Sequence, residues 1–374
     1  MMSPISRQKG LSIVELMVAL TLGLILTAGL VQIFSGNQRT FIVGEASNRV
    51  QETGRMTTEF LSRAVRNADY WGCIPRDNVA NKLDSTHEVY QASEDLFSFS
   101  DGFMAYQSDG TTLGLTGTDA LILRGVGGAG AVQITTVMPN SSANLKVDTV
   151  DGIDDSDILL ISDCIAGDIF QVTGTQTGAN PGINHNGGNS VEPGNSSPSD
   201  GVDVTVDNNC PGDPTKCLSK QYDESAQIYT PYYHQFFLNA DADGRRALFR
   251  QNKAEDAQEV MDGVWDLQMR VGIDSGLSNG EVTQWIDIDG PTALSTAAAA
   301  NVVAVQLSLL GRSPENNIVD APMELCYPSW ADCSGGPNYD VATEVAADSK
   351  HLYRVFTTTA TIRNRILKVE QNEG

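Results

Sequence analysis

The sequence has few of the residues and motifs on which enzyme chemistry usually depends. It contains four histidines, none in an H-E-x-x-H or paired-ligand arrangement: His87, His185, His234 and His351. It has no G-x-S-x-G elbow and no phosphate loop ending in Gly-Lys-Ser/Thr. We therefore expect a protein that is not an enzyme and needs no cofactor, although an active site assembled in space stays an alternative.

Positive charge is also scarce. The chain has 24 lysines and arginines against 47 aspartates and glutamates, a net charge of −23. Nucleic-acid binding requires many Lys and Arg contacts to phosphates, so this balance argues against a nucleic-acid partner. It argues equally against a globular domain that grips an anionic membrane surface. Solubility of the domain is the simpler explanation for the acidic composition.

Cysteine is present in an even number that suits an oxidising compartment: Cys73, Cys164, Cys210, Cys217, Cys326 and Cys333. Cys210–Cys217 and Cys326–Cys333 each enclose six residues typical of turns, which favours two local disulfides and leaves Cys73 for Cys164. A zinc site would need cysteines two to four residues apart, usually with histidine nearby. The spacing predicts three disulfides and no metal centre.

The N-terminus carries the longest apolar run of the chain, Leu11 to Phe34, with Glu15 near its start. The run exceeds the length needed to cross a bilayer. A secretory signal peptide would be shorter and would be cut on its C-terminal side. A plain signal-anchor helix is the stronger alternative, because Arg7 and Lys9 satisfy the positive-inside rule. An ionisable group inside a span is costly and usually functional, so Glu15 needs a partner.

The segment around this carboxylate resembles the class III signal of type IV pilins and pseudopilins: Lys9-Gly10-Leu11-Ser12-Ile13-Val14-Glu15-Leu16. The resemblance implies that a prepilin peptidase cuts after Gly10 and methylates the new N-terminus at Leu11. The leader 1–10 would then be lost, and the net charge would become −25. The family's glutamate falls on Glu15, whose carboxylate would pair with an N-terminal ammonium and so offset much of the cost of burial.

Helical spacing continues beyond the apolar run. No proline occurs between Leu11 and Asn67, so the sequence predicts one helix whose first half, 11–34, spans the membrane. Its second half, 35–69, is amphipathic, with apolar residues at helical spacing and two Glu/Arg pairs at i,i+4. The apolar positions are Val43, Ala46, Val50, Leu61, Ala64 and Ala68.

From residue 70 to 374 the character becomes β, and short apolar runs are separated by Gly, Asp and Asn clusters. Thr173–Cys217 has very few large apolar residues and predicts a long, exposed, flexible insertion. We predict strands at 120–124, 132–137, 145–150, 158–162, 263–273, 281–286, 301–311 and 352–362, and a hairpin of 227–238 with 245–251. The expected fold is α+β, a pilin-like long helix packed on an antiparallel sheet.

Two further patterns have ordinary structural explanations. The acidic clusters Asp151/Asp154/Asp155/Asp157 and Asp241/Asp243 lack the twelve-residue calcium loop with its final Glu, so we interpret them as turns. The aromatic stretch Tyr229–Phe237 fits a core strand better than a partner-binding face.

The resemblance extends to both ends of the chain. Four segments resemble PilW-type minor pilins: Gly54-Arg55-Met56, Tyr70-Trp71-Gly72-Cys73, Tyr353-Arg354-Val355-Phe356 and Arg363-Asn364-Arg365. This resemblance implies a structural subunit that primes type IV pilus assembly, sits at the pilus tip and supports twitching motility and adhesion. Its partners would be the prepilin peptidase, other minor pilins, the major pilin and a large tip adhesin.

The implied location is the bacterial inner membrane, in a single pass with a periplasmic C-terminal domain, and then the pilus fibre. The same signal is found in J-type minor pseudopilins of type II secretion systems, which stay the nearest alternative. A membrane-anchored periplasmic binding protein or enzyme is a more distant one.

Overall fold

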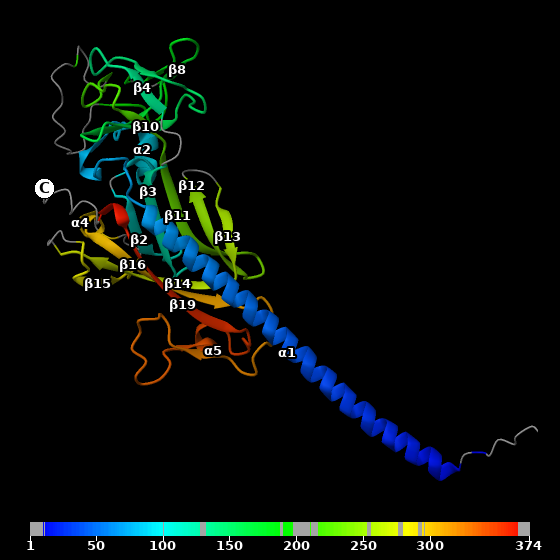
Figure 1. The fold of residues 1–374 in the computed structure, drawn as a ribbon. Coiled ribbons are helices and arrows are strands. Elements are labelled where there is room, and N and C mark those ends of the chain that lie inside the picture. The colour runs from blue at the N-terminus through cyan, green and yellow to red at the C-terminus, as the bar shows by residue number, and fades with distance from the viewer. Residues whose placement is uncertain are drawn as a thin grey trace, which may run out of the picture.

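The computed structural model describes residues 10, 12–99, 101–127, 132–187, 190–196, 210, 216–252, 256–275, 280–290, 294 and 296–365. One long helix, α1 (Ile13–Asn67), extends from a β-rich globular part, and only its second half contacts the sheets (Figure 1). This is the predicted α+β, pilin-like arrangement.

Helix α1 runs for 55 residues without a break, as the lack of proline predicts. The helix ends at Asn67 because the next two residues are not helical: Ala68 is extended and Asp69 has a left-handed φ of 61°. The described short helices are α2 (Glu88–Ala92), α3 (Glu94–Phe97), α4 (Thr296–Ala300), α5 (Val341–Glu344) and a 3₁₀ turn at Arg76–Asn78.

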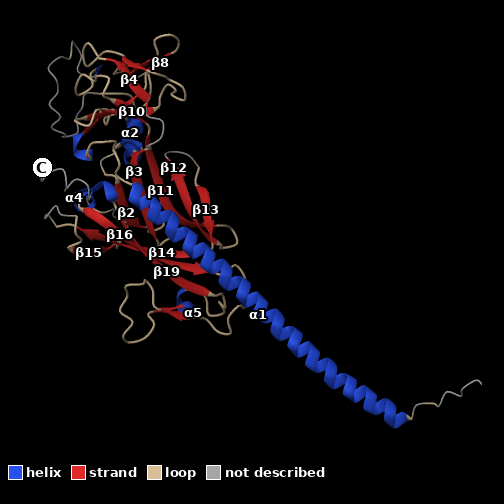
Figure 2. Ribbon diagram, in the orientation of Figure 1, coloured by secondary structure: helices blue, strands red, loops and turns tan. Residues whose placement is uncertain are grey.

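The described strands form three main sheets and a two-stranded hairpin (Figure 2). A four-stranded sheet has the order β15 (Gln284–Asp287), β14 (Val264–Ile273), β16 (Val302–Arg312) and β19 (Tyr353–Thr361). A five-stranded sheet has the order β13 (Gln258–Asp262), β12 (Arg246–Asn252), β11 (Pro231–Ala240), β3 (Asp119–Val126) and β2 (Phe103–Gln107). The hairpin joins β17 (Glu324–Leu325) to β18 (Tyr339–Asp340).

The eight-stranded sheet lies farthest from the N-terminus of α1 (Figure 1). Its order is β1 (Val79–Asn81), β7 (Gly167–Gln171), β6 (Ile158–Ser162), β10 (Gln227–Tyr229), β4 (Val132–Thr136), β5 (Leu145–Val147), β9 (Gly182–Asn184) and β8 (Gly174–Gln176). Among the described strand pairs, only β1 with β7 is parallel. The predicted hairpin of β11 and β12 is present, with Phe236 opposite Arg250.

The segment predicted to be an exposed insertion is partly built into this sheet. Strands β8 and β9 pair with each other, β9 pairs with β5, and Ile183 is fully buried. Asn195 both donates to and accepts from the backbone of Gln171 at 2.7 Å. The expectation of exposure fails here because Ile183 joins a buried apolar cluster and Asn195 is bonded to the neighbouring strand β7. Residues 197–209 and 211–215 lie outside the described part.

The main core joins α1 to both smaller sheets. Leu61 and Val65 of α1, together with Ala68 just after it, pack with buried side chains of β2, β3, β11, β12, β14, β16 and β19. Strand β3 is buried along its whole length, because Leu121 and Leu123 face this core while Ile122 faces a second cluster. The helix, therefore, has a fixed direction relative to the sheets.

One buried carboxyl in this core predicts a pH dependence of stability. Asp119, at the start of β3, is fully buried, and its Oδ2 accepts the Met269 N–H at 2.5 Å. Burial raises the pKa of Asp119 to about 8, although the hydrogen bond from the Met269 N–H acts in the opposite direction. The folded protein, therefore, keeps a proton that the unfolded chain releases near its ordinary pKa of 3.8.

The free energy of unfolding should fall as pH rises from about 4 to 8, by up to roughly 1.4 kcal/mol per pH unit from this group. Asp119→Asn keeps an acceptor oxygen but does not ionise, so its curve should be flatter than that of the wild type in this window. Urea unfolding of the full-length protein in detergent at several pH values measures the difference. Asp243→Asn, in an exposed turn, is the control. Parallel curves for Asp119→Asn and the wild type would contradict the assignment.

Candidate functional site

The first turn of α1 places Glu15 in a capping box. The Ser12 Oγ accepts the Glu15 N–H at 3.2 Å, and the Glu15 Oε2 accepts the Ser12 N–H at 3.0 Å. Two N–H groups that a helix leaves unpaired are thereby satisfied. The sequence argument missed this role, although Ser-x-x-Glu before an apolar run signals it. The pairing of Glu15 with an ammonium at Leu11 stays a prediction, since Leu11 lies outside the described residues, and Gly10 lies exposed before the cap.

The first half of α1 is an exposed apolar surface. Its large side chains from Ile13 to Phe34 are between 51% and 78% accessible. Within the described residues, α1 is the one helix long and apolar enough to cross a membrane, and its most apolar window is not buried in the chain. Such a surface requires lipid or other protein chains around it.

The second half of α1 packs on the four-stranded sheet through a narrow stripe. Its buried positions recur every three or four residues: Ala46, Val50, Gly54, Thr57, Leu61 and Val65. At Gly54 the ring of Phe356 on β19 lies so close that an added Cβ would come within 2.2 Å of it. Gly311 on β16 permits a similarly close approach of helix and sheet, since a Cβ added there would lie 3.3 Å from the Val50 side chain. A larger residue at Gly54 would force the Phe356 ring to move, so glycine permits this close packing of helix on sheet.

The end of α1 is held by a buried polar network around Asp69. The Arg365 Nε donates to the Asp69 Oδ2 at 2.6 Å, and the Trp71 Nε1 donates to the Asp69 Oδ1 at 2.7 Å. The Asn364 Nδ2 donates to the Ala68 carbonyl at 2.8 Å. Both charged side chains are only 6% exposed. The network joins the end of the helix to the segment that follows β19.

The four segments that gave the family resemblance, therefore, meet in two places. Gly54 contacts Phe356 in the middle of the stripe, and Trp71 and Arg365 share Asp69 at the end of the helix. Sequence reasoning could not place Asp69, which is the centre of the second contact. These contacts set the direction in which the exposed apolar half of α1 leaves the sheets.

Two family models match the chain in the regions that this geometry joins. Residues 5–31 match the prokaryotic N-terminal methylation motif. Residues 235–364, which include every strand of the four-stranded sheet, match type IV pilus-assembly protein W, PilW. Together, the two matches support a type IV pilus minor pilin of the PilW type. No curated protein and no solved structure matches it.

The methylation motif and the exposed apolar helix indicate an inner-membrane-anchored pilin with a C-terminal globular domain. The two matches also imply processing by a prepilin peptidase and other pilins as partners. The membrane anchor, the processing and the pilin partners agree with the expectations from the leader sequence.

The cysteines of this pilin form the pairs that their spacing favours. Cys210 joins Cys217, and Cys326 joins Cys333 in the loop between β17 and β18. Cys73 joins Cys164 across 91 residues and ties the end of α1 to the turn between β6 and β7. In the chain-entropy account, a loop of this length stabilises the folded state by roughly 4 kcal/mol.

The four histidines of the pilin lie apart and have structural contacts. His87 caps α2 through the Val89 N–H, and the His351 Nδ1 lies 2.8 Å from the Ser313 carbonyl. Burial lowers the pKa of His185 to about 4, and its Nε2 lies 2.9 Å from the Ala143 carbonyl. Burial and the nearby Arg250 lower the pKa of His234 to about 4. The rings of His185 and His234 are therefore neutral at physiological pH.

The acidic clusters form turns. The Asp157 Oδ2 accepts the Asp154 N–H at 2.9 Å, and the Asp241 Oδ1 accepts the N–H groups of Asp243 and Arg245 at 2.9 Å. Within the described part of the chain, no group of three or more His, Cys, Asp or Glu side chains could hold a metal ion. The aromatic stretch begins with Tyr229 at the end of β10 and continues in β11, where Tyr233, Phe236 and Phe237 are at most 4% exposed.

Proposed function

We propose that this minor pilin primes assembly of the type IV pilus and occupies the tip of the fibre, where it supports twitching motility and adhesion. The observation that carries the proposal is a single helix with two different halves. The first half exposes its apolar side chains and has one carboxylate in its first turn, while the second half packs rigidly on the globular domain.

The proposed sequence of events begins in the inner membrane. Arg7 and Lys9 hold the leader in the cytoplasm, while the segment from Leu11 to Phe34 spans the bilayer and the C-terminal domain lies in the periplasm. The prepilin peptidase cuts after Gly10, and Leu11 then carries a methylated ammonium group. The helix next moves from lipid into the helical bundle of the filament, where apolar packing replaces lipid contacts.

Glu15 sets the register in this mechanism. Its carboxylate already lies at the Ser12 N–H, the backbone group next to Leu11, so an ammonium at Leu11 or on a neighbouring subunit can reach it with little rearrangement. A charge pair that is removed from water is strongly orientation-dependent. We propose that this pair fixes the axial position of the subunit, while apolar packing supplies most of the affinity.

The test is to separate the charge of Glu15 from its capping role. Glu15→Gln keeps an acceptor for the Ser12 N–H, because glutamine also completes a capping box, but it removes the charge. Both Glu15→Gln and Glu15→Ala should be processed normally, yet incorporation into pili should fall by about tenfold or more, as expected for the loss of an interaction of at least 1.4 kcal/mol. Immunoblots of membranes and of sheared pili measure the two steps.

Glu45→Ala is the matched control, since it removes a glutamate from the same helix and breaks only an exposed pair with Arg49. Normal incorporation of Glu15→Gln would contradict the charge-pair mechanism. Scoring the deletion strain for twitching and for exoprotein secretion tests the pilus against a J-type pseudopilin. Loss of secretion with intact twitching would overturn the proposed function.

A further inference from the structure

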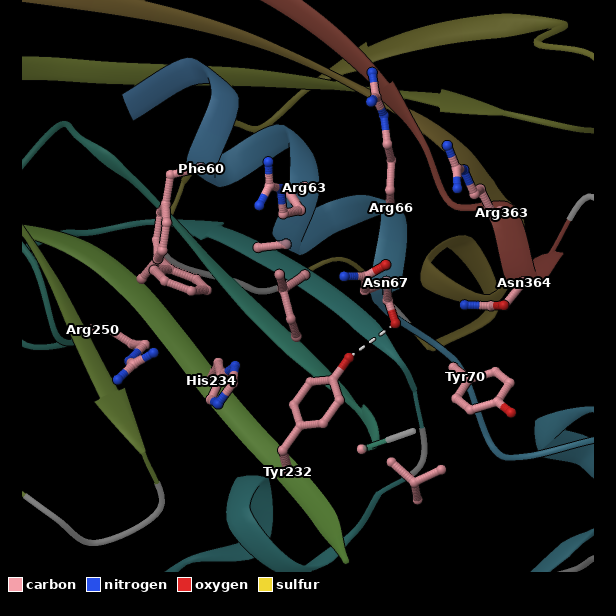
Figure 3. A pocket seen from close by; sticks show the side chains of 15 residues that line it. Phe60, Arg63, Arg66, Asn67, Tyr70, Tyr232, His234, Arg250, Arg363 and Asn364 are labelled. Carbon is pink, nitrogen blue, oxygen red and sulfur yellow. Dashed lines mark hydrogen bonds between the residues drawn. The ribbon is translucent and has the colours of Figure 1, made fainter. Parts of the chain in front are cut away.

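A pocket of about 590 Å³ lies beside the end of α1, between the helix and β11. Its size is within the usual range for binding sites in proteins, about 300–1,000 Å³. The floor is apolar and aromatic, formed by Phe60, Leu123, Val126, Tyr232 and Phe236. The Tyr232 hydroxyl donates to the Asn67 carbonyl at 3.0 Å and so occupies one unpaired acceptor of the helix end (Figure 3).

Four arginines surround this floor, in a chain that is otherwise strongly acidic. Arg63 and Arg66 come from α1, Arg250 from β12 and Arg363 from the segment after β19 (Figure 3). No aspartate or glutamate is among the described residues that line the pocket. The helix dipole explains a cation at Arg66, in the last turn of α1, but not the two arginines from other elements.

These guanidinium groups are poorly neutralised within the chain. Among described residues, Arg66, Arg250 and Arg363 form no ion pair, and Arg63 pairs only with the exposed Glu59 at 3.3 Å. The Arg250 Nε is buried and has no hydrogen-bond partner in the described part. Asp69, the carboxylate just after the end of α1, is already engaged by Arg365 and Trp71. A buried donor without an acceptor is rare and points to a missing partner.

His234, which also lines the pocket, adds no negative charge to it. His234 stacks on Tyr232 with the ring centroids 4.7 Å apart and lies beside Arg250 (Figure 3). Its pKa is lowered to about 4 by burial and by Arg250, so it is neutral at physiological pH. The pocket therefore has an apolar floor and a positive rim, and its chemical complement is a large apolar side chain beside a carboxylate.

The exposure of the rim distinguishes a protein segment from a small metabolite. Arg63, Arg66 and Arg363 are exposed, whereas a small-molecule site encloses most of the surface of its ligand. Arginine and aromatic residues are the types enriched where protein interfaces gain most of their binding energy. The pocket is also built on the last turns of α1, so anything bound there has a fixed position relative to the assembly helix.

We propose that this pocket binds a segment of a neighbouring pilin subunit that presents a carboxylate beside a large apolar side chain. The proposal rests on the proposed function as a pilus subunit. It adds a contact between globular domains to the contacts between helices, and charge complementarity at the four arginines makes this contact selective for acidic segments.

The experiment places a photoreactive benzoylphenylalanine at Asn67, whose side chain is exposed and whose carbonyl remains available to Tyr232. Full-length protein is cross-linked in intact cells, and the linked peptides are identified by mass spectrometry. We expect a peptide of another pilin subunit that contains Asp or Glu. Arg66→Glu with Arg363→Glu should reduce this product by about tenfold or more. Arg55→Glu is the matched control, an exposed arginine on the same helix outside the pocket.

Replacing the identified partner carboxylate with arginine should restore the product in the doubly reversed variant. A product that is insensitive to charge reversal, a product with residues 366–374 of the same chain, or the absence of any product would overturn the proposal. Processing and incorporation into pili are scored in the same cells. If both are normal while the cross-link fails, only the pocket proposal is wrong, whereas failure of incorporation in the wild type would remove the proposed function as well.

Discussion

Cells that carry Gly10→Leu are expected to accumulate the full-length precursor in the membrane, with no detectable mature pilin and no incorporation into pili. The reason lies in the peptidase and not in the fold of the substrate. Gly10 lies outside α1, it is exposed, and an added Cβ would meet no atom within 4 Å. A leucine there leaves the described structure unchanged but places a bulky side chain at the proposed cleavage site.

The effect should be all or none, because a subunit that keeps its charged leader cannot move its N-terminus into an apolar helical bundle. Immunoblotting of the membrane fraction measures it through the size difference of the ten-residue leader. Gly36→Leu is the matched control, since Gly36 is an exposed position on α1 that also has open space around it. A processed band for Gly10→Leu at the wild-type level would contradict the assignment of Gly10.

The second large effect is expected at the end of α1, where Arg365→Met should lower the free energy of unfolding by about 3–5 kcal/mol. Removing one member of a buried ion pair leaves the other charge without a partner in a site that excludes water. Arg365 and Asp69 are each 6% exposed, and the Arg365 Nη1 also donates to the carbonyls of Ala299 and Val302, the latter at 2.9 Å. Methionine fills a similar volume, so the loss reports the polar contacts and not a cavity.

Urea unfolding of the full-length protein in detergent measures this change. Arg245→Met is the control, because Arg245 pairs with Asp241 at an exposed turn, where such pairs contribute at most about 1 kcal/mol. Asp69→Asn combined with Arg365→Met should recover part of the loss, since it removes the isolated charge. A loss for Arg365→Met no larger than that of the control would contradict a structural role for the network.

Much of the architecture could be predicted from the sequence because the signals are local. The absence of proline and the helical spacing of Ala46, Val50 and Leu61 predicted one long helix with a narrow buried face, and these three positions are buried. The hairpin of β11 and β12 and the strands β14, β16 and β19 lie close to their predicted bounds. The spacing of the cysteines favoured the three disulfides that the structure contains.

The network at Asp69 and the strands around Ile183 had no local signal in the sequence. Asp69 is one acid among many in the sequence, and only the return of the chain after β19 brings Arg365 to it, 296 residues later. The segment around Ile183 reads as polar and flexible, yet it forms strands because β9 pairs with β5 and β8 and places Ile183 in a buried cluster. The capping role of Glu15 had a local signal, Ser-x-x-Glu, that the argument from charge pairing overlooked.

The sequence alone determined that this chain has a cleavable leader pattern, a long helix with an apolar first half, and a β-rich acidic domain. These properties follow from neighbouring residues and from the periodicity of helix and strand, which act over a few positions. Tertiary structure alone decided which strands share a sheet, where α1 packs, and that arginines from three distant segments surround one apolar pocket. Such contacts depend on how the chain returns to itself, because hydrophobic burial is not directional and selects partners only when the whole core is packed.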